Sequence, residues 1–538
     1  MRRALTVPAV LVALALVLAA CPAATPNGNG RVPGLEARPG GTLVVAVRDL
    51  GSFDPADASG RGALIAVANV FESLTRVNPH TLGIEPAAAR RWTVSKDGLV
   101  WRFRLADRRW HDGRRVTARD FEFAFDRITR RETRSDNAFQ LEQVEGFTAS
   151  KDAGDARTLA GVRVRGRDVL IIRLRRPFNE LPWMLSHPAM APLPRHLYVQ
   201  RNERLEQRAA RRLERKPVGN GPFRVRRFGP DGALLTRFDG YRPEPALLDA
   251  IDLKLVSSSD EGWEAFLKGD VDVTDVPPSA VHDGSSLFGD EGFTPFWATL
   301  SFALNLERAT YRKPLVRRAI SLAIDRKAIA RDVYGNTRDP ATGIIARGVR
   351  GFSADACGVC TFDPARARQI IKAAFPARKP SITVDFLSEP GGSTQLVARA
   401  IANDLTDVGF RARMKGHSER AYRALLDEDR QDMAMVGWLP DVPTPDGFLS
   451  GQLRSEARDN HAHYSDATFD RLLDRARRTR DGAQRLRSYR QAERRVLGRM
   501  PLIPILFFRN RAVIADRVHD LFLDGAGLFE GERVWLAA

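Results

Sequence analysis

The chain has 538 residues, of which 43% are hydrophobic, and its formal net charge is +18. A chain of this length exceeds what one hydrophobic core supports, so we expect two or three domains. Its 84 Lys and Arg residues are interleaved with 66 Asp and Glu residues and form no compact basic arm, which argues against nucleic-acid binding. The basic balance would equally suit a location near anionic lipids or wall polymers.

Residues 1–20 have the pattern of a signal peptide: a basic start, an apolar stretch from Ala4, and small residues before Cys21. This leader resembles a bacterial lipoprotein signal, in which the cysteine is acylated and becomes the new N-terminus. An ordinary secreted protein and an uncleaved N-terminal anchor remain alternatives, and both also place the chain outside the cell. Residues 21–41 are rich in Pro, Gly, Ala and Asn, which predicts a flexible tether.

The first part of the body, up to about residue 200, mixes strands and helices. A β-rich run predicts a strand at 42–47, and alternation over 99–105 predicts a half-buried strand whose hairpin partner is 92–94. A second hairpin is predicted from 162–164 and 169–174. The aromatic side chains around the first hairpin match one face of it and are interpreted as structural: Trp92, Trp101, Phe103 and Trp110.

A helix is predicted to begin after Thr117, which with Asp120 three residues later can form a capping box. The apolar residues that follow are spaced as one buried stripe of a helix. The stripe consists of Phe121, Ala124, Phe125 and Ile128.

The one pair of neighbouring cysteines, Cys357 and Cys360, lies among turn residues. A CxxC pair can be a local disulfide, two free thiols, or part of a redox or metal site. No second CxxC accompanies it, which argues against structural zinc, and outside the cell an oxidised staple is the expected state.

From about residue 296, strands and helices alternate, which is typical of an α/β lobe. Helices are predicted from Asp363, over 394–407 and over 419–428, and strands over 382–387, 410–415 and 432–438. The sequence contains no GxSxG, HExxH or Walker-type motif, and its nine histidines are scattered. We therefore expect no enzyme, no catalytic residues, no cofactor and no metal site.

Short motifs follow one another in a fixed order along nearly the whole mature chain. They include 71–74, 95–98, 101–105, 110–113, 116–121, 218–223, 266–272, 303–305, 316–320, 323–326, 362–367, 437–441 and 501–504. Together they resemble the family 5 extracellular solute-binding proteins, the peptide/nickel-type receptors of ABC importers. The resemblance implies a periplasmic-binding-protein-like α/β fold of type II, of the large three-domain kind, with a ligand cleft and a hinge between two lobes.

The resemblance also implies a domain division. Lobe I comprises residues 42–292 and 506–538, with an inserted subdomain at about 62–200, and lobe II comprises residues 293–505.

The resemblance places the ligand at the end of the predicted strand 432–438. The segment Gly437, Trp438 and Leu439 would pair with the main chain of a peptide, as an added strand does, and Asp441 would hold its α-ammonium group. Pro440 departs from the common pattern and removes a backbone donor. Asp441 could instead only terminate a loop, and Trp438 could belong to the core as much as to the pocket wall.

Two asparagines, Asn220 and Asn305, are further candidates for ligand contacts, although Asn beside Gly is usually a turn former.

The implied function is the capture of extracellular oligo- or dipeptides and their delivery to the permease and ATPase subunits of an ABC importer. The protein is expected to be a monomer, held at the extracytoplasmic face of the cell membrane by a lipid on Cys21. Alternatives are a non-peptide cargo, such as a metal chelate, oligosaccharide, haem or opine-like solute, or a sensory or chaperone-like lipoprotein without a transporter.

Overall fold

The computed structural model describes residues 37–199, 203–242, 244–281, 294–389 and 392–537. The predicted signal peptide, Cys21 and most of the predicted tether lie outside these residues. Among the helices that the structure describes, none combines the length and the apolar character needed to span a bilayer.

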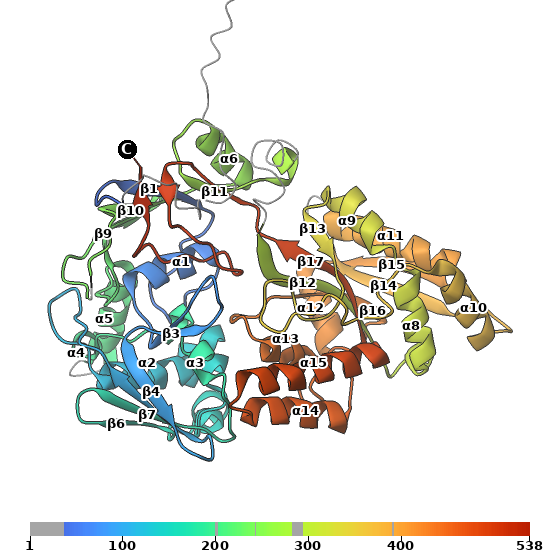
Figure 1. The fold of residues 1–538 in the computed structure, drawn as a ribbon, viewed down its shortest axis with the longest axis horizontal. Coiled ribbons are helices and arrows are strands. Elements are labelled where there is room, and N and C mark those ends of the chain that lie inside the picture. Colours follow the sequence, from blue (N-terminus) through green and yellow to red (C-terminus); the bar gives the residue numbers. More distant parts are fainter. Residues whose placement is uncertain (1–36, 200–202, 243, 282–293, 390–391, 538) are drawn as a thin grey trace, which may run out of the picture.

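Two six-stranded sheets organise the chain (Figure 1), and each lies beside its own large hydrophobic core. The first sheet has the order β18-β11-β1-β10-β9-β8. Its strands are β1 (Thr42–Val47), β8 (Phe223–Gly229), β9 (Gly232–Arg237), β10 (Ala250–Leu255), β11 (Val273–Asp275) and β18 (Ala512–Ile514). The C-terminal part of the chain therefore returns to the sheet that the N-terminal strand begins.

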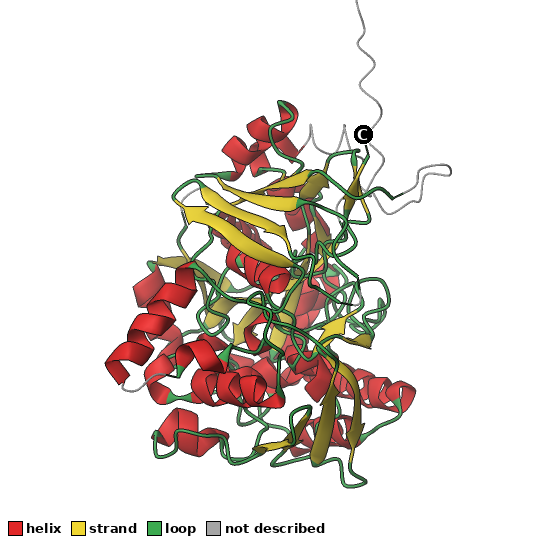
Figure 2. Ribbon diagram, turned by 90° about the vertical axis from the view of Figure 1, so that its left-hand side faces the viewer, coloured by secondary structure: helices red, strands yellow, loops and turns green. Residues whose placement is uncertain are grey.

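A four-stranded antiparallel sheet, β4-β5-β7-β6, completes this half of the molecule, which we call lobe I. Its strands are β4 (Ala89–Val94), β5 (Val100–Leu105), β6 (Val162–Arg165) and β7 (Val169–Arg173). Both predicted hairpins are present, and the rings of Trp101 and Phe103 stack in the core with centroids 6.2 Å apart. Figures 1 and 2 place the first sheet at the top of lobe I and the four-stranded sheet at the bottom, with helices between them.

The helix predicted after Thr117 is α2 (Ala118–Thr129), and it begins with the predicted capping box. Asp120 accepts hydrogen bonds from the backbone N–H and the hydroxyl of Thr117, both at 2.8 Å. The four residues of the predicted stripe are buried, so α2 packs its apolar face against the four-stranded sheet as the spacing predicts.

The second six-stranded sheet, with its helices, forms the other half, which we call lobe II. Its order is β13-β17-β12-β16-β14-β15. Its strands are β12 (Pro295–Leu304), β13 (Arg338–Pro340), β14 (Ser381–Leu387), β15 (Arg411–His417), β16 (Met433–Trp438) and β17 (Leu502–Arg509). The neighbouring strands β17 and β18 belong to different sheets, so the chain crosses from lobe II to lobe I at Asn510 and Arg511, a few residues after the predicted position.

Helices cover the sheets of both lobes (Figure 1). Those of lobe I are α1 (Arg61–Val70), α2, α3 (Leu181–Met184), α4 (Arg195–Tyr198), α5 (Glu203–Arg215) and α6 (Ser259–Leu267). Those of lobe II are α8 (Pro314–Ala323), α9 (Arg326–Tyr334), α10 (Pro364–Ala374), α11 (Ser393–Asp407), α12 (Glu419–Asp427), α13 (Pro445–Leu453), α14 (Ala467–Arg478) and α15 (Gly482–Arg499). The loop between β13 and α10 contains Cys357 and Cys360, which are joined by a disulfide.

Lobes I and II also meet below the crossing strands, where the loop before α3 contacts α13, α14 and α15. The backbone N–H of Asn179 donates to the carbonyl oxygen of Arg477 at 2.9 Å. The Tyr489 hydroxyl donates to Glu180 at 3.3 Å and to Asp446 at 3.2 Å, and Arg485 pairs with Glu180 at 3.5 Å. We call Glu180, Asp446, Arg477, Arg485 and Tyr489 the interlobe cluster.

Candidate ligand-binding cleft

The predicted binding segment lies where β16 leaves the second sheet. β16 pairs with β12 along its whole length, but it pairs with β14 only at Met433 and Ala434. On the β14 side, the end of β16 has no strand partner among the described residues, and Gly437 and Leu439 are exposed. Because no described strand covers this edge, an extended ligand could pair with it.

Trp438 holds this edge in place rather than projecting into open space. Its indole N–H donates to the carbonyl oxygen of Gly447 in α13 at 2.8 Å. A side chain at Gly451 would lie 2.4 Å from the Trp438 ring, so α13 packs closely on the indole. Trp438 is half-buried and also lines a second cavity of about 220 Å³, so it serves both the core and a pocket wall.

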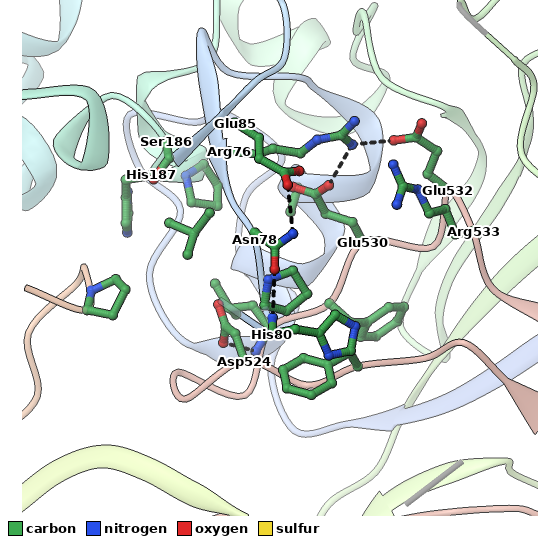
Figure 3. Close-up of a pocket in the computed structure, with 18 of the residues that line it drawn as sticks. Arg76, Asn78, His80, Glu85, Ser186, His187, Asp524, Glu530, Glu532 and Arg533 are labelled. Carbon is green, nitrogen blue, oxygen red and sulfur yellow. Dashed lines mark hydrogen bonds and ion pairs between the residues drawn. The ribbon is translucent and has the colours of Figure 1, made fainter. Parts of the chain in front are cut away.

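Asp441, just beyond β16, lines a cavity of about 400 Å³ to which both lobes contribute (Figure 3). Lobe II supplies Asp441, Pro443 and Trp297. Lobe I supplies the hairpin of β2 (Thr75–Val77) and β3 (Ile84–Pro86), the turn at 186–188, and the C-terminal segment 520–533. The volume falls within the range of small-molecule sites in proteins.

His187 lies beside Asp441 at the wall of this cavity. The His187 side chain is 3% exposed, and its Nδ1 accepts a hydrogen bond from the backbone N–H of Ala189 at 3.2 Å. Burial lowers the pKa of His187, so the ring is neutral at pH 7 and carries its proton on Nε2. Nε2 lies 3.9 Å from Asp441 Oδ1, which is too far for a hydrogen bond.

Asp441 forms no ion pair with a lysine or arginine within the part of the chain that the structure describes. Its side chain is 36% exposed, and burial of the remainder raises the pKa of its carboxyl group. A ligand cation reaching this carboxylate would supply the missing positive charge.

The other two candidate contacts are placed differently from the prediction. Asn220 is fully buried, where its amide accepts from the backbone N–H of Glu72 and donates to the carbonyl oxygen of Glu72, both at 3.0 Å. Asn305 is also buried, and its amide bonds to the backbone of Asp429, Gln431 and Glu307. Both amides satisfy backbone groups that the fold would otherwise bury unpaired, so neither faces the cleft.

The structure also identifies cavity-lining residues that the sequence prediction missed. His187, Trp297, Arg76, Glu530 and Glu532 all line the cavity. Most of them come from turns and from the C-terminal segment, where no periodic pattern or motif marks them. The aromatic Trp297 lies in β12, and its pattern in the sequence does not distinguish a cavity wall from a core position.

Asn220→Ala should lower the free energy of unfolding by about 1–3 kcal/mol, because it leaves two buried backbone groups of Glu72 unpaired. Ligand affinity of the folded variant should equal that of the wild type. Chemical denaturation followed by circular dichroism measures the first quantity and titration calorimetry the second. A variant with unchanged stability and reduced ligand affinity would instead indicate that Asn220 contacts the ligand.

Comparison with known proteins gives consistent results. The family model described as "Bacterial extracellular solute-binding proteins, family 5 Middle" matches residues 83–460. The probable deoxycholate-binding periplasmic protein YgiS of Escherichia coli is 27% identical over 85% of this chain and 86% of its own. Di/tripeptide-binding protein 1 of Pseudomonas aeruginosa is 25% identical over 88% of this chain and 90% of its own.

Solved structures with the same fold are also similar over nearly the full length. The periplasmic murein tripeptide-binding protein MppA in its unliganded open form has a TM-score of 0.81, with 21% identity, and covers 93% of this chain and 99% of its own. DppA of Helicobacter pylori in complex with the peptide STSA has a TM-score of 0.72, with 22% identity and the same coverage.

The predicted α/β periplasmic-binding fold is thereby confirmed, and the relatives are solute-binding proteins, not enzymes. The matched family model covers well over half of the chain, and the relatives extend over most of the remainder. This chain belongs to the family 5 bacterial extracellular solute-binding proteins.

Proposed function

We propose that this protein is the substrate-binding subunit of an ABC importer and that it captures short peptides between its two lobes. The observation that carries the proposal is the free edge of β16 ending beside a carboxylate without a cationic partner. Gly437 to Leu439 would bond to the peptide main chain as a neighbouring strand does. Asp441 would accept the charge-assisted hydrogen bonds of the α-ammonium group.

The names of several relatives support a peptide cargo, since they describe dipeptide-, tripeptide- and oligopeptide-binding proteins. YgiS, in contrast, is named as probable deoxycholate-binding. Deoxycholate is an anion, and the cavity beside Asp441 has more carboxylates than guanidinium groups. The lining therefore favours a peptide with a free ammonium group over an anionic cargo.

Titration calorimetry of the mature protein with tri- and tetrapeptides tests the proposal. We expect binding of peptides with a free N-terminus, weaker binding of their N-acetylated forms, and no binding of deoxycholate. A protein that binds deoxycholate and no peptide of any length would overturn the peptide assignment while keeping the family.

We further propose that Cys21, which lies outside the described residues, carries the lipid anchor and tethers the monomer near its permease. A single acyl chain holds a protein only weakly, whereas two or more hold it stably. A tether also raises the effective concentration of the receptor at its transporter.

Cys21→Ser should release the protein from the membrane fraction and leave its peptide affinity unchanged, because the cysteine is remote from the cleft in the sequence. Membrane fractionation with immunoblotting, followed by calorimetry on the released protein, measures both. Retention of the variant in the membrane fraction would contradict the anchor.

A further inference from the structure

The cavity beside Asp441 is acidic, although the chain as a whole carries a net charge of +18. Six carboxylates line it, whereas the guanidinium groups in its wall number two. The carboxylates belong to Glu85, Asp441, Asp520, Asp524, Glu530 and Glu532, and the guanidinium groups to Arg76 and Arg533. This excess of negative charge raises the local concentration of cations in the cavity.

The carboxylates around Arg76 outnumber the positive charge available to them. One nitrogen of Arg76 serves both Glu532, at 2.5 Å, and Glu530, at 3.4 Å. Glu85 lies opposite Arg76 in the β2–β3 pair, but its carboxylate bonds to the neutral amide of Asn78 at 2.6 Å (Figure 3). Glu530 and Glu532 therefore share one guanidinium group, and Glu85 forms no ion pair among the described residues.

Glu530 is the member of this group most available to a ligand. Its side chain is 48% exposed, whereas that of Glu532 is 13% exposed. Its carboxylate lies on the same nitrogen of Arg76 as the carboxylate of Glu532, so the two negative charges repel each other. A second cation beside Glu530 would relieve this repulsion.

His187 adds a hydrogen-bond donor to the wall of the same cavity. The His187 side chain is 97% buried and lines the cavity. Its Nε2–H makes no hydrogen bond to any described residue. A donor at a cavity wall is available to an acceptor on a bound ligand. The natural acceptor for this donor is a carbonyl oxygen close to the ammonium group held by Asp441.

From these contacts we infer that the site selects peptides whose first residue is basic, with the side chain of that lysine or arginine received among Glu85 and Glu530. The inference rests on the proposed peptide-binding function and deepens it. Asp441 binds the α-ammonium group, and His187 Nε2–H donates to the carbonyl oxygen of the first residue. The carboxylates of Glu85 and Glu530, which we call the acidic wall, bind the side-chain cation. The aromatic rings of Trp297 and Phe522, which also line the cavity, suit a cation as well as an apolar stem.

A matched series of tripeptides tests this inference by calorimetry. Lys-Ala-Ala and norleucine-Ala-Ala have side chains of similar length and differ in charge, while Glu-Ala-Ala reverses the charge and Ala-Ala-Lys moves it. We expect Lys-Ala-Ala to bind about 10- to 100-fold more tightly than norleucine-Ala-Ala, as a charge-assisted contact provides. Glu-Ala-Ala should bind most weakly, and Ala-Ala-Lys should gain nothing from its lysine.

Substitutions then test whether the cavity carboxylates cause the preference for lysine. Glu530→Gln should reduce the preference for lysine over norleucine about tenfold, measured as the ratio of the two affinities in each protein. Glu419→Gln, at an exposed position of α12 outside the cavity lining, is the control and should retain the full preference. Thermal unfolding of each variant confirms that it is folded.

The outcomes separate this inference from the function on which it rests. Equal binding of all four tripeptides, or an equal gain from lysine at the third position, would overturn the selection of a basic first residue and leave peptide capture standing. Absence of binding by any peptide would overturn the proposed function itself. A preference for lysine that survives in Glu530→Gln and in Glu85→Gln would show that the acidic wall is not its cause.

Discussion

Replacing Arg477 by alanine is expected to lower the free energy of unfolding by about 3–5 kcal/mol. Two nitrogens of Arg477 bond to the two carboxylate oxygens of Asp446, each at 2.8 Å, and both side chains are largely buried. Burial alone would raise the pKa of Asp446, but Arg477 holds this pKa below its ordinary value. Without Arg477, an ionised carboxylate would remain in the interlobe cluster with only hydroxyl donors from Ser450 and Tyr489.

Arg478 provides a matched control, since it is the next residue of the same helix. Its side chain is 65% exposed, and its contact with Asp474 is 3.9 Å long, so Arg478→Ala should change stability by less than about 1 kcal/mol. Urea denaturation of both variants, followed by circular dichroism, gives the comparison. Equal effects of the two substitutions would show that the interlobe cluster contributes no special stability.

Asp441→Ala is expected to weaken peptide binding by about 10- to 100-fold. The substitution removes the acceptor for the α-ammonium group and leaves that cation facing an apolar methyl group in a partly buried site. Stability should change little, because Asp441 forms no ion pair with a lysine or arginine of the described chain. Calorimetry with one tripeptide and both proteins measures the loss.

The N-acetylated form of the same tripeptide completes the comparison. Acetylation removes the ammonium group, so wild type and Asp441→Ala should bind this ligand with the same, weak affinity. If the variant lost as much affinity for the acetylated peptide as for the free one, Asp441 would act on the shape of the cleft and not on the ligand charge.

Much of the fold could be predicted from local sequence patterns, because the spacing of apolar residues and the capping residues determine helices and strands locally. The alternation over 99–105 matches β5, and the capping residues Thr117 and Asp120 begin α2 at the predicted place. The predicted alternation of strands and helices after residue 363 corresponds to α10 through β16 with shifts of one or two residues at their ends. Side-chain period and capping chemistry are sufficient for such elements.

The cavity could be predicted only in part, because it depends on distant segments that meet in space. Asp441 could be predicted as a site residue because it lies just after a predicted strand. His187 and Glu530, in contrast, lie 254 and 89 residues away from it in the chain, and neither belongs to a motif. Asn220 and Asn305 show the opposite difficulty, since an amide that supports buried backbone has the same signature in the sequence as one that binds a ligand.

The interlobe cluster also has a mechanical consequence. Among the described residues, the chain passes between the lobes at Asn510 and Arg511, whereas Glu180 contacts Tyr489 and Arg485 at a second, separate place (Figure 1). Two bodies attached at two separated places retain one easy rotation, about the line that connects those places. Arg477 binds Asp446 within lobe II, and Asp446 shares the Tyr489 hydroxyl with Glu180 of lobe I, so Arg477 supports the lower contact indirectly. We therefore expect any rotation of the lobes to occur about this line.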